Sequence, residues 1–144
     1  MRPDWDDYFI EIAKVVSSRG TCLRRTYGAV IVRDRVIIST GYNGSPRGME
    51  NCIDMQKCTR KELNIPSGER YELCEAVHAE QNAIINAPPD RMKGATIYIA
   101  GFEEDRSFAV GKPCKLCDRI IKNAQIKDIV YLEKDGTLAR ITMS

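Results

Sequence analysis

The chain has 144 residues, of which 43% are apolar and 29% are charged, so it can build one compact domain with a single sizeable core. A net charge of +2 is too small to indicate a nucleic-acid-binding protein, although it is compatible with a small anionic substrate. No apolar run approaches the ~20 residues of a membrane span, and the polar N-terminus lacks a secretory leader pattern, so we expect a cytoplasmic protein that binds no membrane.

Hydrophobic periodicity predicts a regular alternation of helices and strands. The first helix shows apolar residues at helical spacing (Trp5, Phe9, Ile12, Val15 and Val16), with Asp4 as its cap. The expected elements in chain order are a helix over 4–18, strands over 27–32 and 35–41 joined by a turn at Arg33 and Asp34, a helix over 78–87 that ends at Pro88 and Pro89, a strand over 95–100, a loop over 101–112, a helix over 114–124, a strand over 127–132, a turn over 134–136 and a short strand over 137–142.

This order predicts an α/β layered domain with a mixed sheet, and we expect a single domain over 1–144. Residues 42–74 lose all periodicity and contain three cysteines. We treat about 44–74 as a Cys-rich insert, because a loop of this length inside a compact domain is usually functional or held by something.

Two short motifs carry the predicted chemistry: His78-Ala79-Glu80 and Pro113-Cys114-Lys115-Leu116-Cys117. Both lie at the expected start of a helix, where thiol pKa values are lowered and thiolates are favoured. Cys114 and Cys117 are three residues apart and share one helix face. With His78, the only histidine, they make three zinc ligands and leave a fourth position for water, as in catalytic zinc sites.

Glu80 is the candidate base beside this metal. Zinc lowers the pKa of a bound water towards ~7, and a nearby carboxylate can accept its proton and pass it on. Residues two apart in a regular helix point to nearly opposite sides, so this role requires that the first helical turn lets His78 and Glu80 face one pocket.

Each half of the pattern has other interpretations. A His-x-Glu pair can occur by chance, and a Cys-x-x-Cys pair also occurs in thioredoxin-like dithiols. A non-catalytic zinc module would keep the cysteines without needing Glu80. The two motifs together, in this order, are more specific than either alone.

The paired motifs are the known signature of zinc-dependent nucleobase deaminases, and the chain resembles the cytidine and deoxycytidylate deaminase family, in particular its deoxycytidylate branch. The resemblance covers about residues 4–131. Besides the signature, it is carried by Asp4-Trp5-Asp6-Asp7-Tyr8-Phe9, by Thr21-Cys22-Leu23-Arg24-Arg25 leading into Gly28-Ala29-Val30-Ile31-Val32, and by Gly41-Tyr42-Asn43-Gly44-Ser45-Pro46-Arg47-Gly48.

This resemblance implies a three-layer α/β/α sandwich with a mixed five-stranded sheet. It also implies hydrolysis of dCMP to dUMP and ammonia, a reaction that feeds dTMP synthesis. Water activated by Zn²⁺ would attack C4 of the cytosine ring, and Glu80 would protonate N3 and then the departing amine. The same chemistry on another base (cytidine, guanine or adenosine in tRNA) stays an alternative.

The resemblance further implies that Asn43 and Ala79 contact the substrate. Asn-Gly is also the commonest hairpin-turn pair, so Asn43 can equally be a turn former. Candidate phosphate ligands are Arg24, Arg25, Arg47, Arg106 and Lys115, each of which can also be a solvated surface charge. The family tends to place a second aromatic residue soon after the Tyr131 strand. This sequence has none there, so it departs from the family pattern near the expected phosphate site.

The other four cysteines, Cys22, Cys52, Cys58 and Cys74, are candidates for a second, structural Zn²⁺. Some deoxycytidylate deaminases carry such a metal near the same loop, with histidine among its ligands. Here the site would have to consist of cysteine alone. Scattered buried thiols are the alternative, and disulfides are disfavoured by the expected reducing compartment.

The family also implies a homo-oligomer, with a hexamer favoured, and regulation by dCTP and dTTP. The candidate effector loop is Tyr42, Asn43, Gly44, Arg47 and Gly48.

Overall fold

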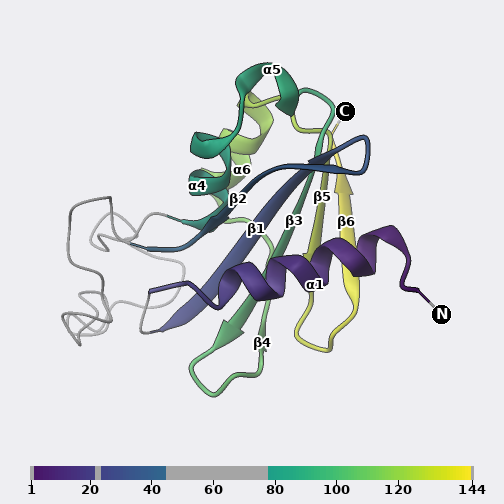
Figure 1. Ribbon diagram of the computed structural model, residues 1–144. Helices are drawn as coiled ribbons and strands as arrows, with labels where there is room; N and C mark the ends of the chain where they lie inside the picture. The colour runs from purple at the N-terminus through teal and green to yellow at the C-terminus, as the bar shows by residue number, and fades with distance from the viewer. Residues whose placement is uncertain (1, 22–23, 45–77, 144) are drawn as a thin grey trace.

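The computed structural model describes residues 2–21, 24–44 and 78–143, which form three layers (Figure 1). Helix α1 covers one face of a central sheet, and α4 and α6 lie on the opposite face. The helices are α1 (Trp5–Ser17), α4 (Ala79–Asn86), α5 (Pro89–Met92) and α6 (Lys115–Asn123), and the strands are β1 (Arg25–Arg33), β2 (Val36–Tyr42), β3 (Thr96–Glu103), β4 (Phe108–Ala109), β5 (Asp128–Leu132) and β6 (Leu138–Thr142).

The sheet is mixed, as the sequence predicted. Its main path runs β2-β1-β3-β5-β6, which gives the expected five strands, and the two-residue β4 adds a sixth beside β3. Every neighbouring pair is antiparallel except β3 and β5, which are parallel. A parallel pair needs a crossover connection, and α6 provides it on the face away from α1.

The central strands are buried on both faces, which explains their nearly continuous apolar sequences. Alternate residues of one strand enter different cores. Ile97 and Ile99 of β3 pack towards α4 and α6, whereas Tyr98 and Ala100 pack towards α1. The same alternation holds in β1 and β5, so each helical layer has its own apolar core.

Helix α1 begins at the expected cap, where the Asp4 carboxylate accepts a hydrogen bond from the Asp7 backbone N–H at 2.9 Å. Its buried face agrees with the predicted one only in part, since Phe9 is buried and Ile12 and Val16 pack against the core. The buried residues are Phe9, Ile10, Ala13 and Ser17, whereas Trp5 is 46% and Val15 71% exposed. The shift follows from Gly28 of β1, where a Cβ would lie only 3.1 Å from Ser17 Cα, so small residues of α1 must face the sheet there.

Three local predictions are corrected. The hairpin turn lies at Asp34 and Arg35, one residue later than expected, with φ values of 52° and 64° that match the twist of a two-residue hairpin loop. Pro89 begins the short helix α5 instead of only ending α4, because proline fits the first helical position. The expected loop over 101–112 contains the end of β3 and the strand β4.

Within the described parts of the chain, no helix combines the length and apolar character needed to cross a membrane.

Candidate metal centre

His78 and Cys114 occupy equivalent positions at the starts of two helices. His78 is the N-cap of α4 and Cys114 is the N-cap of α6, each with extended backbone. The His78 backbone N–H donates to the Gln81 side chain at 3.1 Å, and the Cys117 N–H donates to Cys114 Sγ at 3.4 Å. The sequence prediction that both motifs open a helix is therefore confirmed.

The three predicted ligands converge although α4 and α6 are far apart in the sequence. His78 Nδ1 lies 3.1 Å from Cys117 Sγ and 3.7 Å from Cys114 Sγ. All three donor atoms lie within 4.8 Å of one another, and they form the one group of this kind in residues 2–21, 24–44 and 78–143 that can hold a metal ion.

These separations fit zinc. Bond lengths of about 2.0–2.3 Å in a tetrahedron place neighbouring ligand atoms roughly 3.5–3.8 Å apart, which a small adjustment of the observed contacts satisfies. One nitrogen and two sulfurs are also the donor types that zinc prefers, and three protein ligands leave one coordination position for solvent. The residues thus form a site that can hold one zinc ion.

The two thiols differ in their readiness to ionise. Hydrogen bonding to the Cys117 thiol, aided by contact with His78, lowers the pKa of Cys114 to about 4. The same contact with Cys114, together with burial, raises the pKa of Cys117. Cys117 is completely buried and Cys114 is partly exposed. A divalent cation would remove the remaining proton as it binds both sulfurs.

Glu80 lies on the first turn of α4 and is 7% exposed. Burial raises the pKa of its carboxyl, while its own backbone N–H, the neighbouring His78 and the Cys117 thiol act in the opposite direction. His78 and the Cys117 thiol both influence the pKa of the Glu80 carboxyl, which supports a position near the candidate ligands. That His78 and Glu80 face one pocket stays a prediction.

Asn43 holds the end of β2 against β1. Its Oδ1 accepts from the Tyr27 N–H and its Nδ2 donates to the Arg25 carbonyl, both at 2.8 Å, and the side chain is 7% exposed. Its backbone bonds Tyr27 and Thr21 as well. Contact with a sugar stays a prediction for Asn43, whereas its part in holding the strand end is observed.

Of the described candidate phosphate ligands, the three arginines lie around the start of β1 and the β3–β4 connection, and Lys115 lies on α6. Arg25 forms an ion pair with Glu103 at 2.7 Å, and the Arg106 guanidinium lies 4.6 Å from the centre of the Phe102 ring. Arg24 and Arg25 line one groove with Lys134 and acidic residues. Lys115 is exposed at the first position of α6. Contact of these cations with a phosphate stays a prediction.

Ala79, the other candidate contact, is buried at the start of α4. In the candidate effector loop, Tyr42 is 39% exposed and Gly44 is buried. The other predicted residues, Arg47, Gly48, Cys22, Cys52, Cys58 and Cys74, lie outside the described residues.

Sequence reasoning missed Asn82, whose Nδ2 donates to the Tyr42 carbonyl at 2.7 Å and thereby ties α4 to β2. Its sequence signal is an asparagine inside a short helix, where asparagine is a poorer helix former than alanine.

A histidine and a Cys-x-x-Cys pair that meet at two helix starts, beside a buried glutamate, are the groups that define zinc-dependent base deaminases. The protein-family model of the cytidine and deoxycytidylate deaminase zinc-binding region matches residues 3–133 of the sequence. The chain belongs to this family.

Named relatives agree with this assignment. The chain is 36% identical to a deoxycytidylate deaminase of Mycobacterium phage D29, over 90% of this chain and 95% of the phage protein. It is 37% identical to a deoxycytidylate deaminase of Saccharomyces cerevisiae, over 91% of this chain but only 38% of the yeast protein. The chain thus spans less than two fifths of the yeast relative's length.

Among solved structures, the dCMP deaminase of cyanophage S-TIM5 in its apo form has a TM-score of 0.62 and 25% sequence identity, covering 94% of this chain and 89% of that one. A similarity over this share of the chain confirms the predicted sandwich.

Proposed function

We propose that this chain catalyses the zinc-dependent hydrolysis of dCMP to dUMP and ammonia. The observation that carries the proposal is the cluster of His78, Cys114 and Cys117, together with the buried Glu80 carboxyl, whose pKa His78 and Cys117 influence. The named activity of the phage relative, which aligns over nearly its whole length, supports dCMP as the substrate.

His78, Cys114 and Cys117 would hold the ion through Nδ1 and the two Sγ atoms. When bound there, zinc would supply a Lewis acid and lower the pKa of a coordinated water to ~7. Glu80 would carry one proton of the attacking water to N3 of the ring, then take the second proton from the hydroxyl formed at C4 and pass it to the departing amine. One water is consumed, and its oxygen stays on C4 while ammonia leaves.

The buried position of Glu80 suits both directions of this transfer. Burial raises the pKa of the carboxyl and makes it a stronger base, and the proton it accepts stays in a site that solvent hardly reaches. General acid–base catalysis is most efficient when the pKa of the group is close to the working pH.

The substrate is tested by incubating the zinc-loaded protein with dCMP, cytidine, guanine and tRNA and measuring released ammonia. We expect dCMP to have the highest kcat/KM. Turnover of the free nucleoside without turnover of dCMP would overturn the nucleotide assignment, and turnover of tRNA would assign the chemistry to another base.

The role of Glu80 is tested separately by Glu80→Gln. We expect the variant to keep its zinc and to lose activity by about 10²–10⁴-fold, because the amide cannot transfer the proton. Asn86→Ala, in the last turn of the same helix and away from the metal ligands, is the control for a local change in α4. Undiminished turnover in Glu80→Gln would reject the mechanism.

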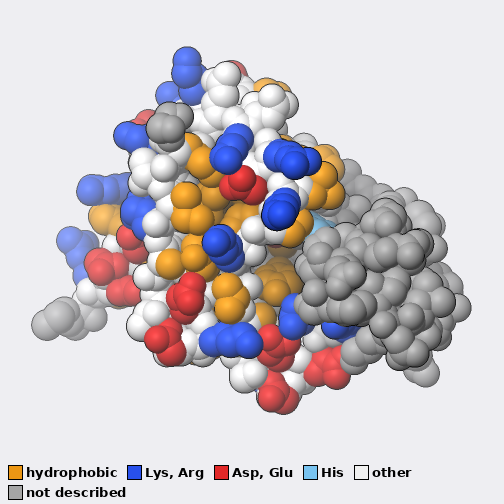
Figure 2. All heavy atoms as spheres, turned by 180° about the vertical axis from the view of Figure 1, so that it is seen from behind, with side chains coloured by type: hydrophobic (Ala, Val, Ile, Leu, Met, Phe, Trp, Pro, Cys, Tyr) orange, Lys and Arg blue, Asp and Glu red, His pale blue; other side chains and the backbone are white. Residues whose placement is uncertain are grey.

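We also propose a homo-oligomer, with a hexamer favoured, and regulation by dCTP and dTTP through the Tyr42–Gly48 loop. Figure 2 shows hydrophobic side chains among lysines and arginines on the face opposite α1. Ile85 of α4 is 71% and Leu116 of α6 is 51% exposed, and exposed apolar side chains of this size favour an interface. Light scattering measures the oligomeric state, and the rate of dCMP turnover with and without dCTP and dTTP measures the regulation. A single deaminase domain over 1–144 and the cytoplasmic compartment stay predictions.

A further inference from the structure

Helix α4 lies directly on the edge strand β2, with the two backbones in contact. Gly41 makes this possible, because a Cβ at that position would lie 2.6 Å from the Ala79 carbonyl oxygen and closer still to the Ala83 nitrogen. The helix buries only Ala79, Glu80 and Ala83. Ile84 is the larger side chain of α4 that packs against the core, and it is only partly buried, so apolar packing restrains the rotation of α4 about its axis only in part.

Polar side chains supply the missing restraint. Asn82 Nδ2 donates to the Tyr42 carbonyl at 2.7 Å, and Asn86 Nδ2 donates to the Thr40 carbonyl at 3.1 Å. Between them, the buried Ser39 hydroxyl donates to the Ala83 carbonyl at 2.7 Å. Two asparagines one turn apart thus bond alternate carbonyls of β2 in the same way.

The two asparagines differ in their distance from the metal ligands along the helix. The Asn82 backbone N–H donates to the His78 carbonyl at 3.0 Å, which closes the first turn that carries His78 and Glu80. Its acceptor residue Tyr42 is followed by Asn43, which is bonded to β1 through both its side chain and its backbone. Asn82 therefore connects the first turn of α4 to a firmly held strand end, whereas Asn86 holds the last turn.

We propose that Asn82 is a positioning residue, which sets the direction of His78 and Glu80 towards Cys114 and Cys117 through its bond to the Tyr42 carbonyl. Its effect on catalysis rests on the proposed deaminase function, but its effect on the metal site does not. Residues behind the metal ligands typically change metal affinity or activity by 10–100-fold when they are replaced.

The test compares Asn82→Ala with Asn86→Ala, because each variant loses one asparagine-to-carbonyl bond between α4 and β2. In Asn82→Ala we expect the zinc dissociation constant, measured by chelator competition, to rise about tenfold, and the thiolate and d–d absorption bands of the cobalt-substituted protein to shift. In Asn86→Ala we expect the zinc dissociation constant to stay within about twofold of the wild-type value and the cobalt spectrum to stay unchanged, because that bond holds the last turn of α4.

Activity gives a second readout. We expect kcat for dCMP to fall about tenfold in Asn82→Ala with KM nearly unchanged, because the metal and base are misplaced while the substrate contacts remain. If the wild-type protein does not hydrolyse dCMP, the proposed function fails, but the zinc and cobalt measurements still decide the role of Asn82.

Asn82→Asp covers the case in which the alanine variant does not fold. It keeps the shape of the side chain but has no N–H to donate, so we expect the weaker zinc binding and shifted cobalt spectrum again. Wild-type zinc affinity and an unchanged spectrum in the folded Asn82 variants, or equal changes in Asn82→Ala and Asn86→Ala, would overturn the proposal.

Discussion

The Nδ1 atom of His78 lies 3.1 Å from the Sγ atom of Cys117, although the two residues are 39 positions apart in the sequence. Cys117 is fully buried, so its sulfur is held by the packing of α6 against the sheet. His78 is held by the first turn of α4. The distances between the candidate metal ligands therefore depend on the position of α4 relative to α6.

The first prediction concerns the thiols in the metal-free protein. The pKa of Cys114 is lowered to about 4 and that of Cys117 is raised, so we expect Cys114 to be a thiolate and Cys117 a thiol at pH 6. Since only the thiolate is nucleophilic, iodoacetamide should alkylate Cys114 well before Cys117, and the rate at Cys114 should fall only as the pH drops towards 4. Peptide mass mapping measures both rates.

Zinc provides the control for this experiment. Coordination occupies both sulfurs, so alkylation of Cys114 should become slow when zinc is restored. Equal rates at the two cysteines in the metal-free protein would contradict the assigned ionisation.

The second prediction concerns the backbone contact at Gly41. Gly41→Ala forces a methyl group into the backbone of α4, which should destabilise the protein by about 3 kcal/mol and weaken zinc binding. Gly94→Ala is the matched control, because a Cβ there would have no atom within 4 Å. The only strain in this variant would come from an alanine at a φ of 77°. It should cost about 1–2 kcal/mol without affecting zinc. Urea unfolding and zinc titration distinguish the two variants.

The third prediction separates the two roles of Asn43. Asn43→Ala removes two buried side-chain bonds to β1 and should destabilise the protein by about 2 kcal/mol in urea unfolding. If Asn43 also binds the sugar, KM for dCMP should rise by up to about tenfold, the equivalent of one hydrogen bond. A destabilised variant with wild-type KM would leave Asn43 with the structural role alone.

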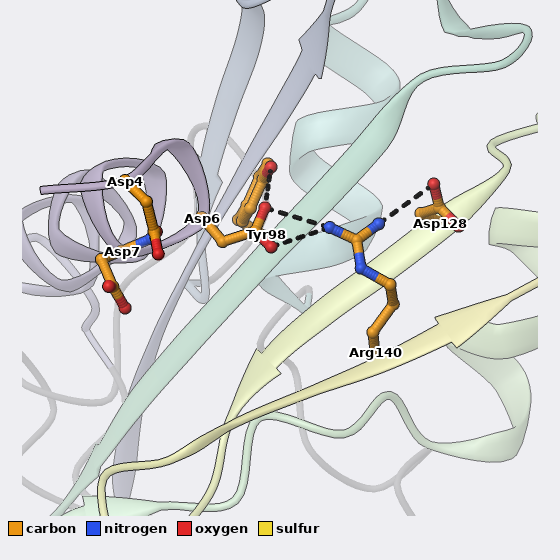
Figure 3. Close-up of polar contacts among 6 residues, drawn as sticks. All are labelled: Asp4, Asp6, Asp7, Tyr98, Asp128 and Arg140. Carbon is orange, nitrogen blue, oxygen red and sulfur yellow. Dashed lines mark hydrogen bonds and ion pairs between the residues drawn. The ribbon is translucent and has the colours of Figure 1, made fainter.

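The fourth prediction concerns a polar network that joins α1 to the last two strands of the chain (Figure 3). Asp6 accepts a hydrogen bond from the Tyr98 hydroxyl at 2.7 Å and pairs with Arg140 at 2.8 Å, and Arg140 also pairs with Asp128 at 3.1 Å. Burial, together with the bond to Asp6, raises the pKa of Tyr98, so the hydroxyl stays protonated as a donor.

Arg140→Gln should destabilise the protein by about 1 kcal/mol, because one guanidinium serves two carboxylates in a partly exposed place. Lys122→Gln, which removes an exposed pair with Asp118 one turn away, should cost at most about 0.5 kcal/mol. The difference should shrink in 1 M salt, where the Debye length is about 3 Å. Equal losses in the two variants at low salt would contradict a special role for Arg140.

Hydrophobic patterns in the sequence predicted the long helices and strands of the fold well. The strands β1, β3 and β5 were predicted from continuous apolar runs, and they are the strands buried on both faces. The buried face of α1 was predicted only in part, because its position also depends on the absence of a side chain at Gly28, a residue of another element. The two-residue β4 is too short for any periodic signal and forms only through its pairing with β3.

The metal ligands were predictable because their chemistry is local. A Cys-x-x-Cys pair at a helix start and a His-x-Glu motif restrict the possible metal and its geometry. Asn82 was not predictable, since its role depends on a carbonyl of β2 that approaches α4 only in the folded chain. The ion pair of Arg25 with Glu103 likewise depends on the register of β1 and β3.

The metal ligands stand on either side of β3 in the sequence, with His78 before it and Cys114 36 positions later. A bound ion would therefore act as a cross-link that closes a large ring of chain around the middle of the sheet. Such a cross-link lowers the conformational entropy of the unfolded chain. The binding free energy of the ion also adds to the free energy of unfolding of the native protein. Chelation should accordingly lower the melting temperature as well as abolish turnover.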